Sequence, residues 1–366
     1  MKKVAILTLP LNNNYGGILQ AWALQNSIEE MGYDTYVLDR LYSPEISLID
    51  KIKLFPKRIF LKYICKKNIP VNLELVEYNQ YIKQNRHTLP FIKKIKRYQI
   101  RNLNQIKERE FDVLCIGSDQ IWRPQYFKIF RWGYTEDAFG YFANKWNTRI
   151  FSYAASFGID SIEEFSLPEI EKIKNIIKRF NGVSVRESSA IKICQDYFDV
   201  NAIPVLDPTM LVERSKYEEL ADSIPSNPSR IGTYILDNSK DKQNIITHLK
   251  SALNTHTENS VRSNQSIEKW ISIFRDSELI VTDSFHGTVF SIIFNKKFIV
   301  LRNNERGMSR IENILRLLDC QHHLVDSIQE ITDINNYKIG KNQLYKLEAL
   351  KEHSRSFLKF ALKGEI

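Results

Sequence analysis

Short apolar runs alternate along the chain with longer segments in which apolar residues recur at helical spacing, the pattern of an α/β protein. The first apolar run, residues 4–9, is followed by two glycines and then by a helical pattern over residues 18–31, which Gly32 ends. A second apolar run follows at residues 36–38. This order predicts a strand, a helix and a second strand, the unit from which parallel sheets are built.

Four more apolar runs in the first half of the chain each end in small or polar residues. They predict strands over residues 111–116, 149–158, 182–185 and 205–209. A basic region of helical character, residues 41–110, precedes them and is predicted to interrupt the sheet. Because the polar residues follow each strand at the same relative place, we expect their side chains to gather at one edge of a parallel sheet.

The α/β alternation starts again after a proline-containing stretch, residues 223–229. Further strands are predicted at residues 232–236, 279–281 and 298–301, and helices at residues 242–253, 267–276, 289–294 and 345–362. The predicted architecture is two doubly wound, Rossmann-like α/β domains that face each other across a cleft. Their expected boundaries are residues 1–222, with the basic insertion at 41–110, and residues 223–345. A C-terminal helix at residues 346–366 could pack back on the first domain.

Composition excludes several classes of protein. The 366 residues are 43% hydrophobic, and no apolar run approaches the roughly 18 residues that a membrane-spanning helix needs. The apolar run after Met1 stops at Pro10, too soon for a secretory signal, so the expected location is the cytoplasm. The four cysteines are scattered and lack metal-ligand spacing, so we expect neither a metal site nor a disulfide framework.

The net charge of +9 is concentrated in one segment. Residues 51–70 contain seven lysines and arginines and no acidic residue, interleaved with aromatic and aliphatic side chains. This pattern suits a helix that lies against the anionic inner face of the plasma membrane, and equally a solvated basic surface that covers the core. No nucleic-acid recognition motif accompanies the charge, so nucleic acid is not an expected partner.

The strongest candidates for catalytic residues come directly after the strand predicted at residues 279–281. Ser284, Phe285, His286 and Gly287 follow this predicted strand and begin the next helix. In open parallel sheets ligands bind at this edge, a helix start attracts anions, and histidine can deliver a proton near neutral pH. Arg302 and Arg306 follow the next predicted strand, so a proton donor and a guanidinium are expected to share one crevice if the two strands are neighbours.

Further candidates follow other predicted strands. Asn14, Tyr15, Gly16 and Gly17 form a turn in which backbone can approach a ligand, although it is neither a dinucleotide-binding nor a P-loop motif. Arg186 follows residues 182–185 and could bind an anion or pair with a nearby acid. Ser118, Asp119 and Gln120 follow residues 111–116. Their side chains could bind sugar hydroxyls or satisfy the amides of a turn.

Taken together, these motifs resemble the polysaccharide pyruvyl transferase family over roughly residues 4–310. The resemblance rests on the order of Asn14-Tyr15-Gly16-Gly17, Gly117-Ser118-Asp119-Gln120, Val183-Ser184-Val185-Arg186-Glu187, Leu206-Asp207-Pro208-Thr209 and Asp283-Ser284-Phe285-His286-Gly287. It implies a fold similar to GT-B glycosyltransferases. It also implies transfer of the pyruvyl unit of phosphoenolpyruvate, a co-substrate, to a sugar as a ketal, without a metal or another cofactor.

The resemblance also implies roles for individual residues. His286 is the expected general acid, and Arg186 with Arg306, or Arg302 in its place, is expected to bind the donor beside Ser284, Phe285 and Gly287. The acceptor is expected on the other domain, at Asn14 to Gly17 and Ser118 to Gln120. Phosphoenolpyruvate carries a carboxylate and a phosphate, so arginines that bind both groups bidentately suit it, and Arg186 and Arg306 could clamp it on closure.

Two other functions remain open from the sequence. A GT-B-like fold could house a nucleotide-sugar glycosyltransferase, and the same cleft could belong to a non-catalytic sugar-binding protein. The sugar acceptor, whether free, lipid-linked or nucleotide-linked, is not fixed by any motif. The expected product is a precursor of a surface or capsular polysaccharide.

Overall fold

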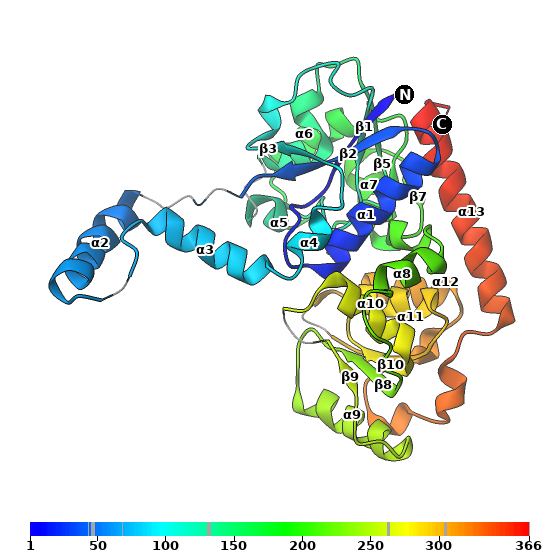
Figure 1. Cartoon of the computed structure of the whole chain (residues 1–366). Helices are drawn as coiled ribbons and strands as arrows, with labels where there is room; N and C mark the ends of the chain where they lie inside the picture. Colours follow the sequence, from blue (N-terminus) through cyan, green and yellow to red (C-terminus); the bar gives the residue numbers. More distant parts are fainter. Residues whose placement is uncertain are drawn as a thin grey trace.

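The chain folds into two α/β lobes, and a helical arm projects from the first of them (Figure 1). The structure is a computed structural model, and it describes residues 1–42, 44, 48–67, 69–129, 133–261, 264–303 and 306–365. The fold follows the predicted alternation of strands and helices in both halves of the chain.

The first lobe is built on a five-stranded parallel sheet with the order β3-β2-β1-β4-β5. Its strands are β1 (Lys3–Leu7), β2 (Asp34–Arg40), β3 (Arg97–Ile100), β4 (Val113–Ile116) and β5 (Arg149–Ser152). Two short strands, β6 (Ser184–Val185) and β7 (Ile203–Pro204), continue it through a bridge between Ala155 and Val185. The central strands are apolar throughout, because helices cover both faces of the sheet.

The helices of this lobe include the predicted one after the first strand and several for which the sequence analysis gave no bounds. They are α1 (Tyr15–Glu30), α4 (Leu89–Ile92), α5 (Pro124–Ile129), α6 (Leu167–Ile177), α7 (Ser188–Phe198) and α8 (Arg214–Ala221). The arm consists of α2 (Leu48–Ile59), a π-helical turn (Phe60–Ile64) and α3 (Leu73–Asn85). Helix α1 begins three residues earlier than predicted because the Asn14 side chain caps it, accepting a hydrogen bond from the amide of Gly17 at 3.2 Å.

The prediction that residues 41–110 form one helical insertion is wrong at its C-terminal end. Residues Arg97–Ile100 form β3, the edge strand of the first sheet, paired in parallel with β2. An edge strand exposes one side to solvent and tolerates charged residues there, so its sequence resembles a basic surface segment. The inserted helices therefore end before residue 97.

The second lobe repeats the architecture with the order β12-β11-β10-β8-β9, again all parallel. Its strands are β8 (Ser229–Tyr234), β9 (Asn259–Ser260), β10 (Ser277–Thr282), β11 (Lys297–Leu301) and β12 (Leu324–Val325). Its helices are α9 (Lys240–Ala252), α10 (Ile267–Asp276), α11 (Phe285–Ile293) and α12 (Ser309–Leu317), and α13 (Lys341–Lys363) follows them. Strands β10 and β11 are neighbours. The sequence analysis required this arrangement for His286 and an arginine after β11 to share one crevice.

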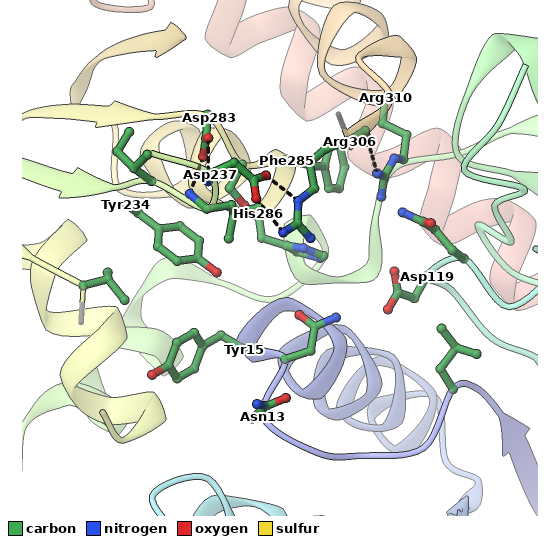
Figure 2. A pocket seen from close by; sticks show the side chains of 18 of the residues that line it. Asn13, Tyr15, Asp119, Tyr234, Asp237, Asp283, Phe285, His286, Arg306 and Arg310 are labelled. Atoms are coloured by element: carbon green, nitrogen blue, oxygen red, sulfur yellow. Dashed lines mark hydrogen bonds and ion pairs between the residues drawn. The ribbon is translucent and has the colours of Figure 1, made fainter. Parts of the chain in front are cut away.

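The order of strands reverses between β1 and β4 in the first sheet and between β8 and β10 in the second. Such switch points leave a crevice at the carboxyl ends of the strands, where the connecting loops diverge. The loops from the two switch points face each other across the same gap, as the close-up in Figure 2 shows. The fold thus directs both lobes toward one site.

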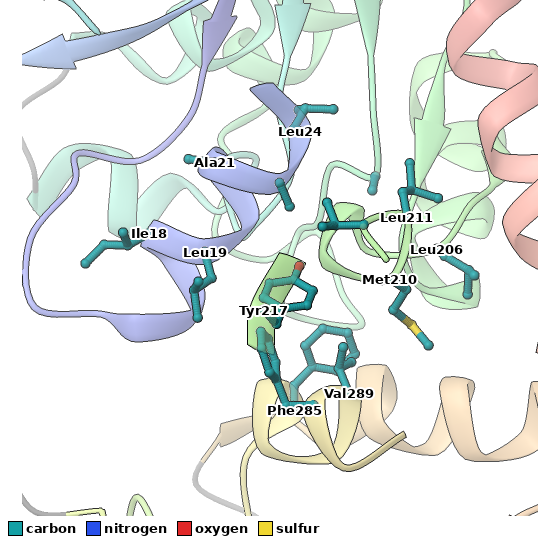
Figure 3. Close-up of a cluster of buried hydrophobic side chains, with 14 of the residues drawn as sticks. Ile18, Leu19, Ala21, Leu24, Leu206, Met210, Leu211, Tyr217, Phe285 and Val289 are labelled. Carbon is teal, nitrogen blue, oxygen red and sulfur yellow. The ribbon is translucent and has the colours of Figure 1, made fainter. Parts of the chain in front are cut away.

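A continuous apolar core joins the lobes beside this gap (Figure 3). Ile18 and Leu19 of α1 belong to the same buried cluster as Tyr217 of α8 and Val289 of α11. Helix α13 returns to the first lobe, where Ser354 Oγ accepts a hydrogen bond from the amide of Leu206 at 3.0 Å. The two lobes are therefore connected by buried hydrophobic contacts as well as by the chain.

Candidate functional site

The gap between the lobes holds a cleft of about 740 Å³. Residues from both lobes line it, among them Asn13, Tyr15, Asp119, Asp283 and His286 (Figure 2). Ligand sites of α/β proteins are found in this position, at the carboxyl ends of parallel strands between two domains.

His286 lies in the first turn of α11, at the bottom of the cleft and only 8% exposed. Ser284 caps this helix, and its Oγ accepts a hydrogen bond from the amide of Gly287 at 3.4 Å. A Cβ at Gly287 would lie 2.1 Å from Thr282 Oγ1, so only glycine lets the helix begin so close to β10. The motif therefore fixes the imidazole at the end of the strand.

The imidazole is held against the other lobe by Gly16 of α1. A Cβ at Gly16 would lie 2.0 Å from His286 Nδ1, within the ring itself. The first turns of α1 and α11 therefore meet at His286. Both helix N-termini carry partial positive charge, which favours an anion in the cleft beside the imidazole.

Asp207 lies behind His286 and was given no role by the sequence, although it stands within one of the family motifs. Its Oδ2 accepts a hydrogen bond from Arg186 Nη1 at 2.7 Å and lies 3.7 Å from His286 Nε2, a contact longer than a hydrogen bond. Thr209 Oγ1 donates to Oδ1 at 2.6 Å. Burial acts to raise the pKa of Asp207, but His286, Arg186 and Thr209 outweigh burial and hold this pKa well below its usual range. Asp207 is thus a permanent carboxylate beside the imidazole.

Arg186 is buried behind the wall of the cleft, with 2% of its side chain exposed. It pairs with Asp207, not with its sequence neighbour Glu187, and its Nη2 lies 3.7 Å from Asp119 Oδ1. Its guanidinium carbon lies 4.6 Å from the ring centroid of Phe285. Nε and Nη2 have no hydrogen-bond partner within the described parts of the chain. Arg186 therefore sits next to the cleft without lining it.

Arg310, in the second position of α12, lines the cleft and was missed by the sequence analysis. With its amide oxygen turned toward Arg310, Gln120 accepts hydrogen bonds from both Nη atoms at 2.7 Å. Arg310 Nε is buried and has no partner among the described residues. Burial and the nearby charge of Arg186 lower the pKa of Arg310 to about 10. An anion in the cleft would pair with the guanidinium and so offset both its burial and its repulsion from Arg186.

The two arginines between which the sequence did not decide lie in different places. Arg306 lines the rim of the cleft and holds Asp237 through two hydrogen bonds, of 2.6 and 2.9 Å. Arg302 pairs with Glu312 at 2.7 Å and Asp326 at 2.8 Å and does not line the cleft. The structure thus places Arg302 outside the cleft, where carboxylates of α12 and of the segment after β12 hold its guanidinium.

Some of the residues predicted to bind the acceptor line the cleft, and others do not. Asn14, Tyr15, Asp119 and Gln120 line the cleft, whereas Ser118 is fully buried beneath it. Ser118 Oγ lies 3.4 Å from Asp207 Oδ2, so its hydroxyl faces the protein interior. Gly16 lies under His286, and a Cβ at Gly17 would approach Asp119 Oδ2 to 3.3 Å. The two glycines shape the floor of the cleft, and Ser118 is not available to a ligand.

Asp283 organises the loops of the second lobe around His286. Its carboxylate accepts hydrogen bonds from the amide of Leu236 at 2.6 Å, from Lys242 Nζ at 2.7 Å and from Asn303 Nδ2 at 2.9 Å. Because these donors come from three separate segments, Asp283 fixes the wall of the cleft and has little capacity left to act on a ligand.

Within the described ranges, no cluster of three or more histidine, cysteine or acidic side chains is placed to hold a metal ion. Among these residues, no helix combines the length and the apolarity that crossing a bilayer requires.

Comparison with known proteins gives a family and a fold. The family model for polysaccharide pyruvyl transferase matches residues 14–305. No curated protein sequence matches the chain significantly. The crystal structure of Arabidopsis thaliana UGT89C1 complexed with UDP-L-rhamnose is similar over 100% of this chain and 99% of its own, with 9% identity and a TM-score of 0.50. The S. aureus MnaA–UDP co-structure is similar over 100% and 98%, with 12% identity and a TM-score of 0.47. The likeness to UGT89C1 shows the fold alone, which is GT-B-like.

Proposed function

The chain belongs to the polysaccharide pyruvyl transferase family, and on this premise we propose that it moves the pyruvyl unit of phosphoenolpyruvate onto two hydroxyls of a sugar as a cyclic ketal. The observation that carries the proposal is the position of His286. It is held between the first turns of two helices, with the carboxylate of Asp207 3.7 Å behind it and an open cleft in front. The sugar is proposed to belong to a precursor of a surface or capsular polysaccharide.

The donor requires cationic groups for a phosphate and a carboxylate on one three-carbon skeleton. The meeting N-termini of α1 and α11 supply amides for one anionic group. Arg310 supplies a guanidinium that reaches the cleft and has an unpaired Nε. Arg306 at the rim can contribute only by sharing its hydrogen bonds with Asp237, and Arg186 acts through Asp207 and Phe285. Arg310 is therefore the arginine best placed to bind the donor.

The proposed reaction begins when His286 protonates C3 of phosphoenolpyruvate, which turns the methylene into a methyl group and leaves an oxocarbenium centre at C2. One acceptor hydroxyl attacks C2 and loses its proton. The C2–O bond to phosphate then breaks, and a second hydroxyl attacks C2, loses its proton and closes the ring. General acid catalysis of this kind contributes about 100- to 10,000-fold in rate.

Asp207 supports this chemistry without touching the donor. A fixed carboxylate lies behind the ring, with Asp207 Oδ2 3.7 Å from His286 Nε2, and limits how the ring can turn. The proposed reaction involves no net oxidation or reduction, so it requires no redox cofactor. Its one co-substrate is phosphoenolpyruvate. Asn14, Asp119 and Tyr15, which line the cleft, are left to hold the acceptor sugar.

Incubation with phosphoenolpyruvate and candidate sugars in D₂O tests the proposal. We expect release of inorganic phosphate and a product whose new methyl group carries one deuterium, because an exchangeable imidazole proton is added to C3. A nucleotide sugar that yields nucleoside diphosphate in place of this reaction would identify a glycosyltransferase. Saturable sugar binding without any turnover would identify a binding protein.

A further inference from the structure

The helical arm formed by α2, the π-helical turn and α3 has no role in the reaction proposed for the cleft. It extends from the first lobe away from both sheets, with α2 at its far end (Figure 1). An arm of this kind costs conformational entropy and buries little surface of its own. Its surface therefore indicates what it contacts.

Large apolar side chains are exposed on the outer part of the arm. Ile52 is 66% exposed, Phe60 55%, Tyr63 66% and Ile64 67%. Pro56, Phe55 and Ile52 also line an open apolar groove against Val71 and Leu73 at the start of α3. Clusters of exposed apolar residues on this scale mark an interaction surface, since isolated exposed apolar residues are normal but grouped ones are not.

Basic side chains surround these apolar residues. Residues 51–70 contain seven lysines and arginines and no acidic residue. Lys53, Lys57 and Lys62 are exposed, and no ion pair is found for them among the described residues. Interleaved lysines and exposed aromatic or aliphatic residues on a helix match the headgroup and acyl regions of an anionic lipid surface.

Helix α3 connects this surface with the cleft. Glu74, near its start, borders the apolar groove, and Gln84, near its end, lines the cleft. The two positions are about 15 Å apart along the helix axis. A second cavity of about 410 Å³, lined by Tyr42, Glu77 and Tyr81, shares Asn13 and Gln84 with the cleft and lies on the side toward the arm.

We propose that the arm docks on an anionic lipid bilayer and so places the mouth of the cleft at the membrane surface, where a sugar carried on a lipid would lie. This inference rests on the proposed function for the nature of the acceptor. The partner is the bilayer, because the charge of the arm complements anionic headgroups and its exposed side chains are long enough to enter the acyl boundary. The second cavity extends the cleft for an acceptor larger than one sugar.

Sedimentation of the full chain with vesicles tests the docking. We expect it to pellet with vesicles of phosphatidylcholine and phosphatidylglycerol, to bind pure phosphatidylcholine weakly, and to lose binding as salt rises. Combining Lys53→Glu, Lys57→Glu and Lys62→Glu should weaken partitioning about 100-fold. Lys240→Glu, Lys341→Glu and Lys359→Glu, at exposed lysines elsewhere, change the net charge equally and should leave partitioning unchanged. Unchanged melting temperatures show that the variants fold.

A fluorescent label on the native cysteine of the arm tests whether the arm itself contacts the bilayer. Cys65 is exposed, while Cys115, Cys194 and Cys320 are buried, so a thiol-reactive, environment-sensitive fluorophore labels Cys65 selectively. Its emission should shift to the blue when phosphatidylglycerol vesicles are added. The same label on a Cys65→Ser, Lys359→Cys variant, on α13, should not respond.

Three outcomes overturn the proposal. The first is equal binding to neutral and anionic vesicles, and the second is equal weakening by both sets of charge reversals. The third is a dimer that Phe60→Ser with Ile64→Ser abolishes, without vesicle binding, which would assign the arm to a second copy of the chain. Phosphate release from phosphoenolpyruvate in vesicle-free solution reports on the proposed function separately. It should be the same in arm variants and wild type, so either hypothesis can fail alone.

Discussion

At the scale of single residues, the site combines one imidazole with a buried carboxylate behind it and a guanidinium beside the cleft. His286 touches the first lobe at Gly16, faces Asp207 at 3.7 Å and opens to the cleft. Arg310 reaches the same space with an unpaired Nε. Each of these groups can be removed singly, with a control residue of the same type elsewhere in the chain.

Replacing His286 by glutamine removes the proposed proton donor while keeping a polar side chain of similar length. We expect turnover to fall by about 100- to 10,000-fold, with the affinity for phosphoenolpyruvate nearly unchanged. Steady-state phosphate release and calorimetric titration of the donor measure the two quantities. His353→Gln, at an exposed histidine of α13, is the control and should behave as wild type. Turnover that survives in His286→Gln would remove the acid role.

Replacing Arg310 by lysine keeps the charge and loses the planar fork. We expect the KM for phosphoenolpyruvate to rise by about 10- to 100-fold, because lysine cannot bind an anion bidentately and hold Gln120 at once. Arg302→Lys is the matched control, since Arg302 pairs with Glu312 and Asp326 outside the cleft. A larger effect at Arg302 than at Arg310 would contradict the assignment of the donor site.

At the scale of elements, the site depends on where two helices begin. Both α1 and α11 follow the strand of their sheet that borders a switch point, and their first turns meet at His286. Asn14 and Ser284 cap the two helices through hydrogen bonds from Gly17 and Gly287. The caps and the glycines are local features of the sequence, whereas the meeting of the two turns is not.

Gly16→Ala tests this junction. The added Cβ would overlap the His286 ring, so the imidazole must move and we expect turnover to fall by about 100-fold or more. Gly17→Ala is the comparison in the same turn and should cost less activity, because its Cβ would lie 3.1 to 3.3 Å from the side chains of Asn14 and Asp119, which need to shift by much less than the His286 ring. Alanine favours the helix at both positions, so a loss of stability in place of activity would contradict the explanation.

His323, buried between β11 and the segment after α12, gives the second lobe an acid-sensitive element. Its Nδ1 lies 2.9 Å from the carbonyl oxygen of Phe298, and its Nε2 is buried without a partner among the described residues. Burial and the neighbouring His322 lower the pKa of His323 to about 4. The folded state thus resists protonation that the unfolded state accepts, so stability is full above about pH 6.5 and is lost as the pH falls toward 4.

Urea unfolding at several pH values measures this effect. We expect the free energy of unfolding to fall by about 2 to 3 kcal/mol between pH 7 and pH 4.5 through His323 alone. His323→Asn should remove this part of the pH dependence, since it has no titrating group, whatever its stability at pH 7. His322→Asn, at the exposed neighbour, should retain most of it. Equal slopes in all three proteins would contradict the assignment.

At the scale of the whole molecule, the buried core that crosses between the lobes decides how the site works. Ile18, Leu19, Tyr217 and Val289 belong to one apolar cluster, and α13 fastens the end of the chain to the first lobe. Domains joined by large hydrophobic contacts move little relative to each other. The cleft is therefore formed without any movement of the lobes, and the clamping on closure that the sequence suggested is not required to bring its residues together.

Small-angle X-ray scattering tests this rigidity. We expect the radius of gyration to remain unchanged within error when phosphoenolpyruvate saturates the protein, because closure would have to break buried apolar contacts. Hydrogen exchange in the loops at Asp237 and Gln120 should slow locally on binding. A clear decrease in the radius of gyration would instead show that the lobes close.

The sequence by itself determined the order of most strands and helices along the chain, the two-domain α/β architecture and the motifs at the strand ends. These depend on local periodicity, capping residues and glycines, which neighbouring residues specify. It missed β3, because an edge strand with charged residues has the pattern of a solvent-exposed segment.

Only the tertiary structure decided which side chains share the cleft. Asp207 meets His286 and Arg186 from three separate segments, Arg310 meets Gln120 across the lobes, and Ser118 and Arg302 face elsewhere. Such contacts depend on the order of strands in the two sheets and on the direction of each side chain. Neither quantity is encoded in the spacing of residues along the chain, because it is set by the packing of segments that are far apart in sequence.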